Sequence, residues 1–272
     1  MSLLKINGVQ VQATASEWQP VTLGEMARTL NGAPRSTARV RKTDLRYTSG
    51  LLTVPEAQLL RALVQGDGHV LAFDDNSTPA AHLYTSTGVA PSEVPPPGIG
   101  LGYSRVAGRF GSGVRVYEPY VIAYANLVPP YSPLTMFGWL PSATSPQHLL
   151  VIRDDNNALI GWYLNGVLQA DPYPPVVFAY DETTGDVAIS GTDGDISVDD
   201  VVILPYAVPD SWVPAIYAFH NSRPWPALPY VLAQDPRLPA SGLLCLGETG
   251  SSQALPLRTS VAERVEFTLY GT

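Results

Sequence analysis

Apolar residues recur at helical spacing in only one clear stretch of this 272-residue chain. The stripe consists of Ala57, Leu60, Leu63 and Val64. Thr53 and Glu56 have the spacing of a capping box, and Pro55 falls in the first turn, where its missing N–H costs nothing. Gly66 follows the stripe and favours a helix end. The pattern predicts one amphipathic helix, followed by a short strand at 69–73.

Elsewhere apolar and polar positions alternate with a period of two, which indicates half-buried β-strands. The first third predicts strands at 3–11, 18–23 and 40–51, and Asn7–Gly8 is the signal of a tight type I′ turn. In the middle, strands recur roughly every ten residues with a turn signal between them, which is typical of a β-sandwich. They are expected at 117–127, 135–140, 148–154, 158–164, 176–180, 186–190 and 198–204. Asn165–Gly166 marks a further tight turn.

Residues 261–270 alternate like the first third of the chain. We therefore expect this last strand to pair in the N-terminal sheet, which makes the middle of the chain an inserted domain. The predicted domains are a split module, 1–75 with 231–272, and an inserted sandwich, 76–230. Residues 209–239 are rich in proline and are interpreted as irregular.

Composition fits this view, since 26 Pro and 23 Gly suit many short strands joined by turns. No apolar run reaches 18 residues, so the sequence predicts no membrane-spanning helix. Residues 1–12 alternate as a strand and turn, unlike a signal peptide. Cys245 is the single cysteine, so there is no intramolecular disulfide and no cysteine metal cluster.

Charge is unevenly distributed along the chain. Residues 1–71 hold eight Lys and Arg against five Asp and Glu, whereas 72–240 hold six against sixteen. The basic side chains gather in a polar loop at 28–39 and in the strand after it. We predict a subunit interface there, formed by Arg28, Arg35, Arg39, Arg41 and Lys42, with a purely solvated loop as the alternative. No aromatic residues interleave with the cluster and the chain is acidic, which argues against nucleic-acid binding.

The candidate catalytic and metal motifs are incomplete. Asp193–Gly194–Asp195 is the best calcium fragment, but no EF-hand-like spacing follows, so turn chemistry is favoured. The four histidines are scattered and form no HxxxH motif: His69, His82, His148 and His220. There is no G-x-S-x-G elbow, and no Gly-rich segment lies between a strand and an amphipathic helix. We therefore predict no enzyme activity, no metal and no cofactor.

Aromatic residues suggest a possible glycan-facing surface in the middle of the chain. The candidates are Trp162, Tyr163, Tyr173 and Tyr180. Trp162 and Tyr163 are adjacent in a predicted strand, so one should face the core and the other solvent. Packing in the core of the sandwich is the alternative role for each of these rings.

Four segments resemble the N-terminal module of certain tailed-bacteriophage tail proteins. They are the INGV strand at Ile6, the R-T-L-N-G-x-x-R loop at Arg28, the L-T-x-x-E-A-x-x-L-x-A-L-x-x-G-x-G-H helix at Leu52 and the V-E-F-T-L strand at Val265. The similarity covers about the first 75 and last 40 residues. It implies a ring-forming, tail-tube-like or distal-tail module in a virion tail. Such a protein is made in the host cytoplasm and contacts itself and other tail proteins.

Residues 76–220 resemble laminin-G-like, concanavalin-like jelly rolls. The matching features are the strand and charged turn at 151–156, Y-x-N-G-V at Tyr163 and the aspartate-rich strand 194–203. The chain departs from the pattern at 173–175, where a Pro-rich segment lies, and it lacks the calcium ligands of some members. The resemblance implies a domain that can bind host-surface glycans.

Together these patterns predict a mainly β protein, in which a small sheet-or-barrel-plus-helix module carries an inserted β-sandwich. The expected function is a structural component of a bacteriophage tail, at the distal tip or in the tube, forming a ring and projecting the sandwich outward. The alternative is a carbohydrate-binding module for attachment to the host surface. Neither role requires insertion into a membrane.

Overall fold

The chain is mainly β, as predicted, and forms two compact units. The computed structural model describes residues 4–23, 26–28, 34–36, 40–71, 73, 82–85, 92–93, 103–117, 120–124, 126–141, 145–191, 194–226, 230–238, 242–256 and 261–272. Unit 1 comprises Met1–Asp67 with Pro226–Thr272, and unit 2 comprises Gly68–Trp225. Each unit is described by itself below.

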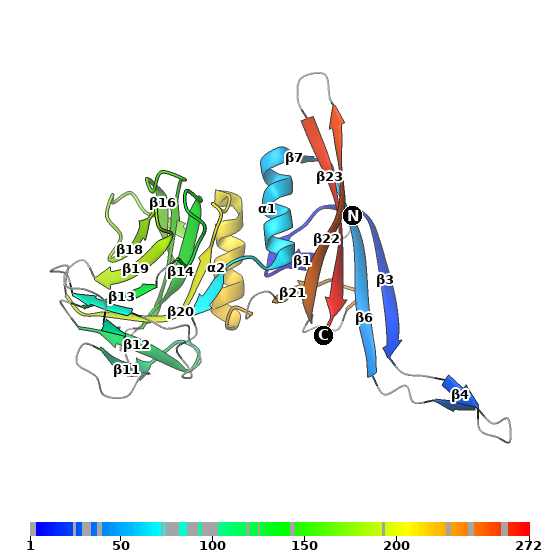
Figure 1. The fold of residues 1–272 in the computed structure, drawn as a ribbon, viewed down its shortest axis with the longest axis horizontal. Coiled ribbons are helices and arrows are strands. Elements are labelled where there is room, and N and C mark those ends of the chain that lie inside the picture. The colour runs from blue at the N-terminus through cyan, green and yellow to red at the C-terminus, as the bar shows by residue number, and fades with distance from the viewer. Residues whose placement is uncertain are drawn as a thin grey trace. The chain divides into compact units, whose positions relative to one another are not determined.

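Unit 1 is a curled antiparallel sheet with one helix on one face (Figure 1). Its sheet has the order β2-β1-β21-β22-β23-β6-β3, and β7 pairs with β23. The bounds are β1 Lys5–Ile6, β2 Val9–Gln10, β3 Ala13–Leu23, β6 Val40–Ser49, β7 Leu52–Thr53, α1 Val54–Gln65, β21 Tyr230–Gln234, β22 Leu243–Pro256 and β23 Val261–Gly271. Between β3 and β6, β4 Met26–Arg28 and β5 Pro34–Ser36 pair as a separate two-stranded sheet.

The last strand lies inside the sheet of unit 1, which confirms the predicted pairing. β23 is flanked by β22 and β6, with Phe267 opposite Tyr47 and Leu269 opposite Leu45. The rings of Phe267 and Tyr47 stack with their centroids 5.5 Å apart. Unit 1 therefore needs both ends of the chain to complete one sheet.

Helix α1 has the predicted caps and the predicted buried stripe. The Thr53 side chain accepts from the backbone N–H of Glu56, and the Glu56 carboxylate accepts from the backbone N–H of Thr53. Gly66 ends the helix in the left-handed region at φ 68°. The four stripe residues are buried against the sheet: Ala57, Leu60, Leu63 and Val64. Burying these side chains, together with an ion pair from Arg61 to Glu263 of β23, fixes α1 on this face.

Both predicted Asn–Gly turns are present. Asn7 and Gly8 have φ values of 45° and 79° and join β1 to β2. Asn165 and Gly166 have φ values of 52° and 79° and join two strands of unit 2. Two successive residues with positive φ define the type I′ turn, which matches the twist of paired strands.

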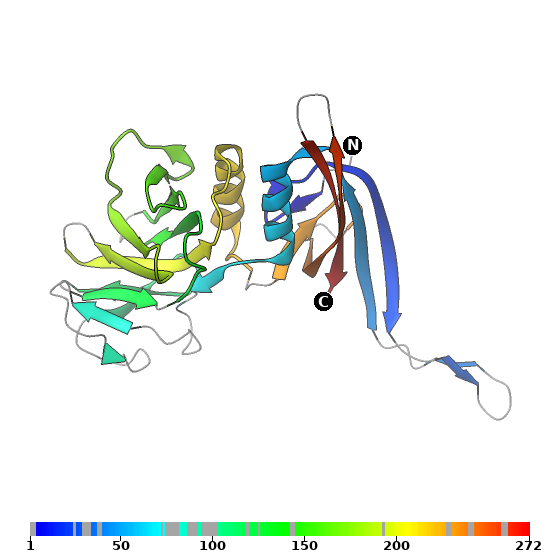
Figure 2. The same cartoon turned by 45° about the horizontal axis from the view of Figure 1, so that its top comes forward.

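Unit 2 is a sandwich of two antiparallel sheets (Figure 2). The smaller sheet has the order β10-β9-β13-β19-β18 and the larger β11-β12-β20-β14-β15-β16-β17, with β8 paired to β20. Their bounds are β8 His69–Leu71, β9 His82–Thr85, β10 Ser92–Glu93, β11 Tyr103–Ala107, β12 Ser112–Val116, β13 Tyr120–Tyr124, β14 Leu134–Leu140, β15 Gln147–Arg153, β16 Leu159–Leu164, β17 Val167–Leu168, β18 Val176–Asp181, β19 Asp186–Gly191 and β20 Ile196–Leu204. Buried side chains from both sheets, including Met136, Phe178 and Ile189, form its core.

The interpretation of 209–239 as irregular was wrong. A 3₁₀ turn, η1 Asp210–Trp212, leads into helix α2 Val213–Ser222, and β21 follows in unit 1. Pro214 falls in the first turn of α2, where a helix tolerates proline, so proline content misled the prediction. Helix α2 packs against β15 through His220, which lies next to His148.

Candidate functional site

The sheet of unit 1 has α1 on one face and no described helix on the other. Gly247 marks the helix side, because a Cβ placed on it would meet the carbonyl oxygen of Val64 in α1. Leu269 and Leu45 share this side through their cross-strand registers. Since side chains alternate along strands, their neighbours Leu246, Tyr270 and Arg46 point the other way. We call that surface the helix-free face.

Four large hydrophobic side chains lie exposed on the helix-free face. They are Tyr230, Leu244, Leu246 and Tyr270, with 38%, 42%, 41% and 40% of their surface exposed. Tyr230 pairs with Leu246, and Leu246 pairs with Tyr270, so three neighbouring strands place them in one row. Leu244 lies two positions along β22, on the same face. We call this group the apolar stripe.

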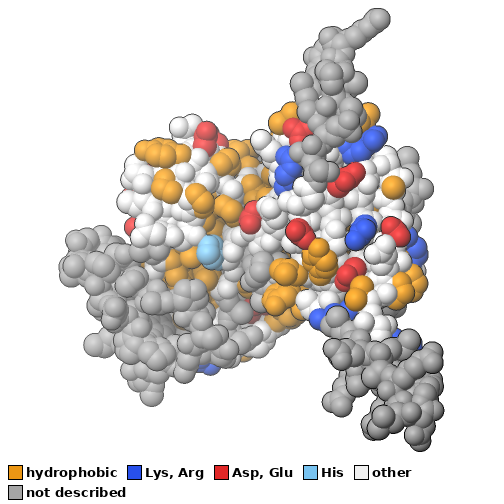
Figure 3. Space-filling view, turned by 45° about the vertical axis from the view of Figure 1, so that its right-hand side comes forward, with side chains coloured by type: hydrophobic (Ala, Val, Ile, Leu, Met, Phe, Trp, Pro, Cys, Tyr) orange, Lys and Arg blue, Asp and Glu red, His pale blue; other side chains and the backbone are white. Residues whose placement is uncertain are grey.

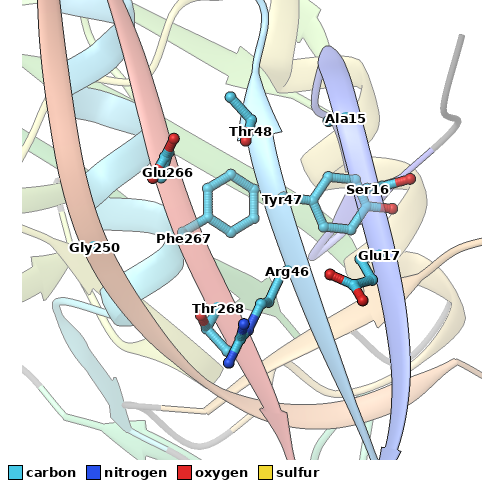
Figure 4. Close-up of a pocket in the computed structure, with 10 residues that line it drawn as sticks. All are labelled: Ala15, Ser16, Glu17, Arg46, Tyr47, Thr48, Gly250, Glu266, Phe267 and Thr268. Atoms are coloured by element: carbon cyan, nitrogen blue, oxygen red, sulfur yellow. The ribbon is translucent and has the colours of Figure 1, made fainter.

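Beyond the apolar stripe, the helix-free face becomes polar and hollow. A cavity of about 360 Å³ is lined by Ala15, Ser16, Glu17, Arg46, Tyr47, Thr48, Gly250, Glu266, Phe267 and Thr268. Figure 4 shows the side chain of Arg46 reaching from β6 toward Thr268 of β23, with Glu17 on the neighbouring β3. We call this cavity the polar hollow. Its charged lining is two carboxylates and one guanidinium.

Acidic groups also surround the hollow. Tyr270 donates its phenol hydrogen to Oε2 of Glu248 at 2.5 Å, and this hydrogen bond raises the pKa of Tyr270. Gln19 donates to Oε1 of Glu17 at 2.8 Å. Figure 3 shows apolar side chains interspersed with charges of both signs on the right-hand side of the molecule. The stripe and the hollow thus form one surface that offers apolar contact and negative charge together.

The predicted basic residues lie near the outer end of β3 and β6. Arg28 is in β4 and Arg35 in β5, at adjacent positions of paired strands. Arg41 is exposed on β6, and Lys42 follows it; these two pair with Thr22 and Val21 of β3. Arg39 lies outside the described residues. The segment predicted as an open loop therefore contains a short two-stranded hairpin.

Three of the four predicted glycan-facing rings are buried in unit 2. Trp162 donates its indole hydrogen to the carbonyl of Asp171 at 2.5 Å, and Tyr163 donates to Oδ1 of Asp210 at 2.6 Å. Tyr180 donates to the carbonyl of Pro129 at 3.1 Å. Trp162 and Tyr163 were expected to face opposite environments, but the Asp210 contact shows that η1 covers the second side. Their rings present no open face to a sugar.

Tyr173 is the exception among these aromatic residues, with 77% of its surface exposed. Its backbone N–H donates to Oδ1 of Asp171, which fixes the turn that carries the ring. The exposed ring is thus carried on a turn whose backbone is held by Asp171.

Of the fragment that suggested calcium, Asp193 lies outside the described residues, whereas Asp195 is described. Described aspartates on turns make local contacts. Asp154 accepts backbone hydrogens from Asn156 and Ala158, as in an Asx turn, and Asp195 pairs with Arg115 at 2.9 Å. Within the described ranges, no group of three or more His, Cys, Asp or Glu side chains could hold a metal ion. The described helices include none long and apolar enough to cross a membrane.

The apolar stripe was missed by the sequence interpretation, although a signal for it exists. Residues 243–246 read Leu-Leu-Cys-Leu, so both faces of β22 carry apolar side chains. A strand covered on one side alone should alternate, whereas an unbroken apolar run indicates burial on both sides. In the described part of this chain, no element covers the second face of β22.

No family model matches the chain, and no curated protein matches it. Among solved structures, domain 4 of AbnA, a GH43 extracellular arabinanase from Geobacillus stearothermophilus in complex with arabinotriose, is similar at 16% identity and a TM-score of 0.29. That similarity covers 51% of this chain and 100% of the other. The binding domain of Paraclostridial Mosquitocidal Protein 1 is similar at 12% identity and a TM-score of 0.25, over 51% of each chain. Scores this low identify neither family nor function.

Proposed function

We propose that this protein is a non-catalytic structural subunit of a bacteriophage tail, in which copies of unit 1 join in a ring and unit 2 is carried on it. The apolar stripe is the observation that carries the proposal. Four large hydrophobic side chains in adjacent positions of one sheet favour an interface over a solvated surface. The resemblance of the first 75 and last 40 residues to tail modules is the reason for proposing a phage tail as the assembly.

The architecture supports the same role. Unit 1 completes its sheet with strands from both ends of the chain, and its core lies between α1 and the sheet. The helix-free face is therefore free to bind a partner without unfolding the unit. A unit inserted between α1 and β21 is repeated once in every subunit of a ring, so weak contacts made by unit 2 gain strength through avidity.

The oligomeric state tests this proposal. Light scattering after size-exclusion chromatography should give the mass of a closed oligomer for the full chain, and Leu246→Asp should give the monomer. Because Leu246 is partly exposed, this variant should keep the circular dichroism spectrum of the wild type. Leu168→Asp is the matched control, since Leu168 is exposed on β17 of unit 2. Mass spectrometry of purified phage particles should then detect the chain.

A monomeric wild type would contradict the ring, as would a Leu246→Asp variant that assembles like the wild type. Absence of the chain from particles, despite assembly in solution, would overturn the tail role and leave only a self-associating protein.

A second candidate function, glycan binding by unit 2, rests on Tyr173. Its exposed ring is carried on a turn held by Asp171, and carbohydrate sites combine a stacking ring with hydrogen-bonding groups. A glycan array probed with the full chain and with Tyr173→Ala tests it. Binding that the substitution abolishes would support attachment to host-surface glycans, and an array without signal would remove this role.

A further inference from the structure

We infer that the polar hollow receives the basic hairpin segment, residues 26–42, of a neighbouring copy of the same chain. The inference rests on the proposed ring and names the surfaces that meet in it. The hollow brings Glu17 and Glu266 together in a cavity of about 360 Å³, beside the apolar stripe. The hairpin segment supplies the opposite charge.

The strands of the hairpin, β4 and β5, lie far from the hollow of their own chain. The hollow is lined by Ser16 and Tyr47, which pair with each other, whereas the outer end of these strands is the pair Leu23 and Val40. Tyr47 and Val40 are seven positions apart on β6, which corresponds to roughly 23 Å of extended strand. Figures 1 and 2 both show β4 beyond this outer end. A contact between hairpin and hollow is therefore made between two chains.

Charge complementarity selects this occupant. Residues 26–42 contain five basic residues, Arg28, Arg35, Arg39, Arg41 and Lys42, and no acidic one. Besides Glu17 and Glu266, the helix-free face carries Asp44 and Glu248. Outside the hairpin segment, the basic residues on the same strands and face are Arg46 and Arg264, so carboxylates outnumber guanidinium groups there. A guanidinium binds a carboxylate with two parallel hydrogen bonds, which gives such a contact direction as well as strength.

The contact joins two different surfaces, so it is heterologous. Repetition of a heterologous contact around a rotation axis gives a ring when the rotation closes. The apolar stripe then lies next to the bound hairpin, whose sequence also supplies apolar residues at Met26, Ala27, Pro34 and Val40. The hairpin segment can thus contact both the acidic polar hollow and the apolar stripe.

Charge reversal on each side tests the inference with the full chain. The face variant carries Glu17→Arg and Glu266→Arg, and the hairpin variant carries Arg28→Glu and Arg35→Glu. Each alone should weaken self-association roughly 100-fold or more, because like charges then meet in the interface. The fourfold variant, and an equimolar mixture of the two double variants, should recover the oligomer mass. Asp155→Arg with Glu182→Arg, two carboxylates of unit 2 outside both proposed sites, is the matched control and should assemble as the wild type does.

A second measurement does not depend on the variants. The wild-type oligomer should dissociate more readily at about 1 M than at about 0.05 M salt, since ions screen the contact. The inference is overturned if the wild type assembles and both double variants assemble equally well. It is also overturned if folded double variants recover neither as the fourfold variant nor in the mixture, or if assembly is independent of salt. A wild type that never assembles overturns the proposed ring, and this contact with it.

Discussion

At the scale of single residues, Gly247 sets the distance between α1 and the sheet. A Cβ on this residue would lie 1.6 Å from the carbonyl oxygen of Val64, far inside any allowed contact. The glycine is needed here for close approach of two backbones, and no special φ is involved. The burial of the helix stripe therefore depends on one position of β22.

Gly247→Ala should destabilise unit 1 by about 3 kcal/mol, because α1 must move off the sheet to make room. Gly250→Ala is the matched control on the same strand, since its Cβ would meet its nearest neighbour at 3.4 Å, an ordinary contact. Urea unfolding followed by circular dichroism measures both. Equal stability of the two variants would mean that the helix adjusts at no cost and that the close approach is not a constraint.

At the scale of elements, the features that could be predicted from the sequence are those with local signals. The capping box Thr53–Glu56 and the Asn–Gly turns each form within four consecutive residues. A short sequence motif is therefore enough to predict them. The last strand could be assigned to the N-terminal sheet because its alternation matched that sheet. The structure contains each of these predicted elements, because no distant contact overrides the local sequence preference.

Elements whose environment is set by distant contacts could not be predicted. Helix α2 follows a proline-rich stretch, and its stability comes from packing on β15, which the sequence does not encode locally. The burial of Tyr163 depends on Asp210, 47 positions away along the chain. The apolar stripe likewise has no cover within the described chain, and we propose a second copy of the chain as that cover.

The packing of α2 on β15 predicts a pH dependence. Nε2 of His148 lies 3.1 Å from Nδ1 of His220, and both side chains are fully buried. Burial lowers the pKa of His148 from 6.5 to about 3, and burial together with the neighbouring His148 lowers the pKa of His220 to about 2. The unfolded chain therefore binds more protons than the folded one between these values and pH 6.5.

Stability should therefore fall as the pH drops below 6.5, by about 2 kcal/mol per histidine at pH 5. Thermal unfolding between pH 7 and pH 5 measures this slope above the range in which most carboxylates titrate. The double variant His148→Phe and His220→Phe should flatten the slope. An equally steep slope in the double variant would assign the pH dependence to other groups.

At the scale of the whole molecule, the two units have independent cores. The sheet of unit 1 is built from strands before residue 67 and after residue 226, and its helix lies in the first of these parts. The core of unit 2 is formed by its own two sheets, and β8 belongs to it through β20. The alternation of the last strand was enough to predict this insertion from the sequence. The candidate site on the helix-free face could be found only from the structure, because the register of three strands places its apolar residues in one row.

Removal of unit 2 should therefore leave a folded unit 1. A chain in which a short Gly/Ser linker replaces residues 68–225 keeps every strand of the unit 1 sheet and helix α1, and α1 already packs against β21, where the chain re-enters. We expect a single cooperative thermal transition and the same oligomer number as the full chain, because the apolar stripe, the polar hollow and the hairpin all remain. Calorimetry and light scattering measure the two properties. A shortened chain that folds but stays monomeric, beside a full chain that assembles, would assign the assembly contacts to unit 2 and overturn the role proposed for the helix-free face.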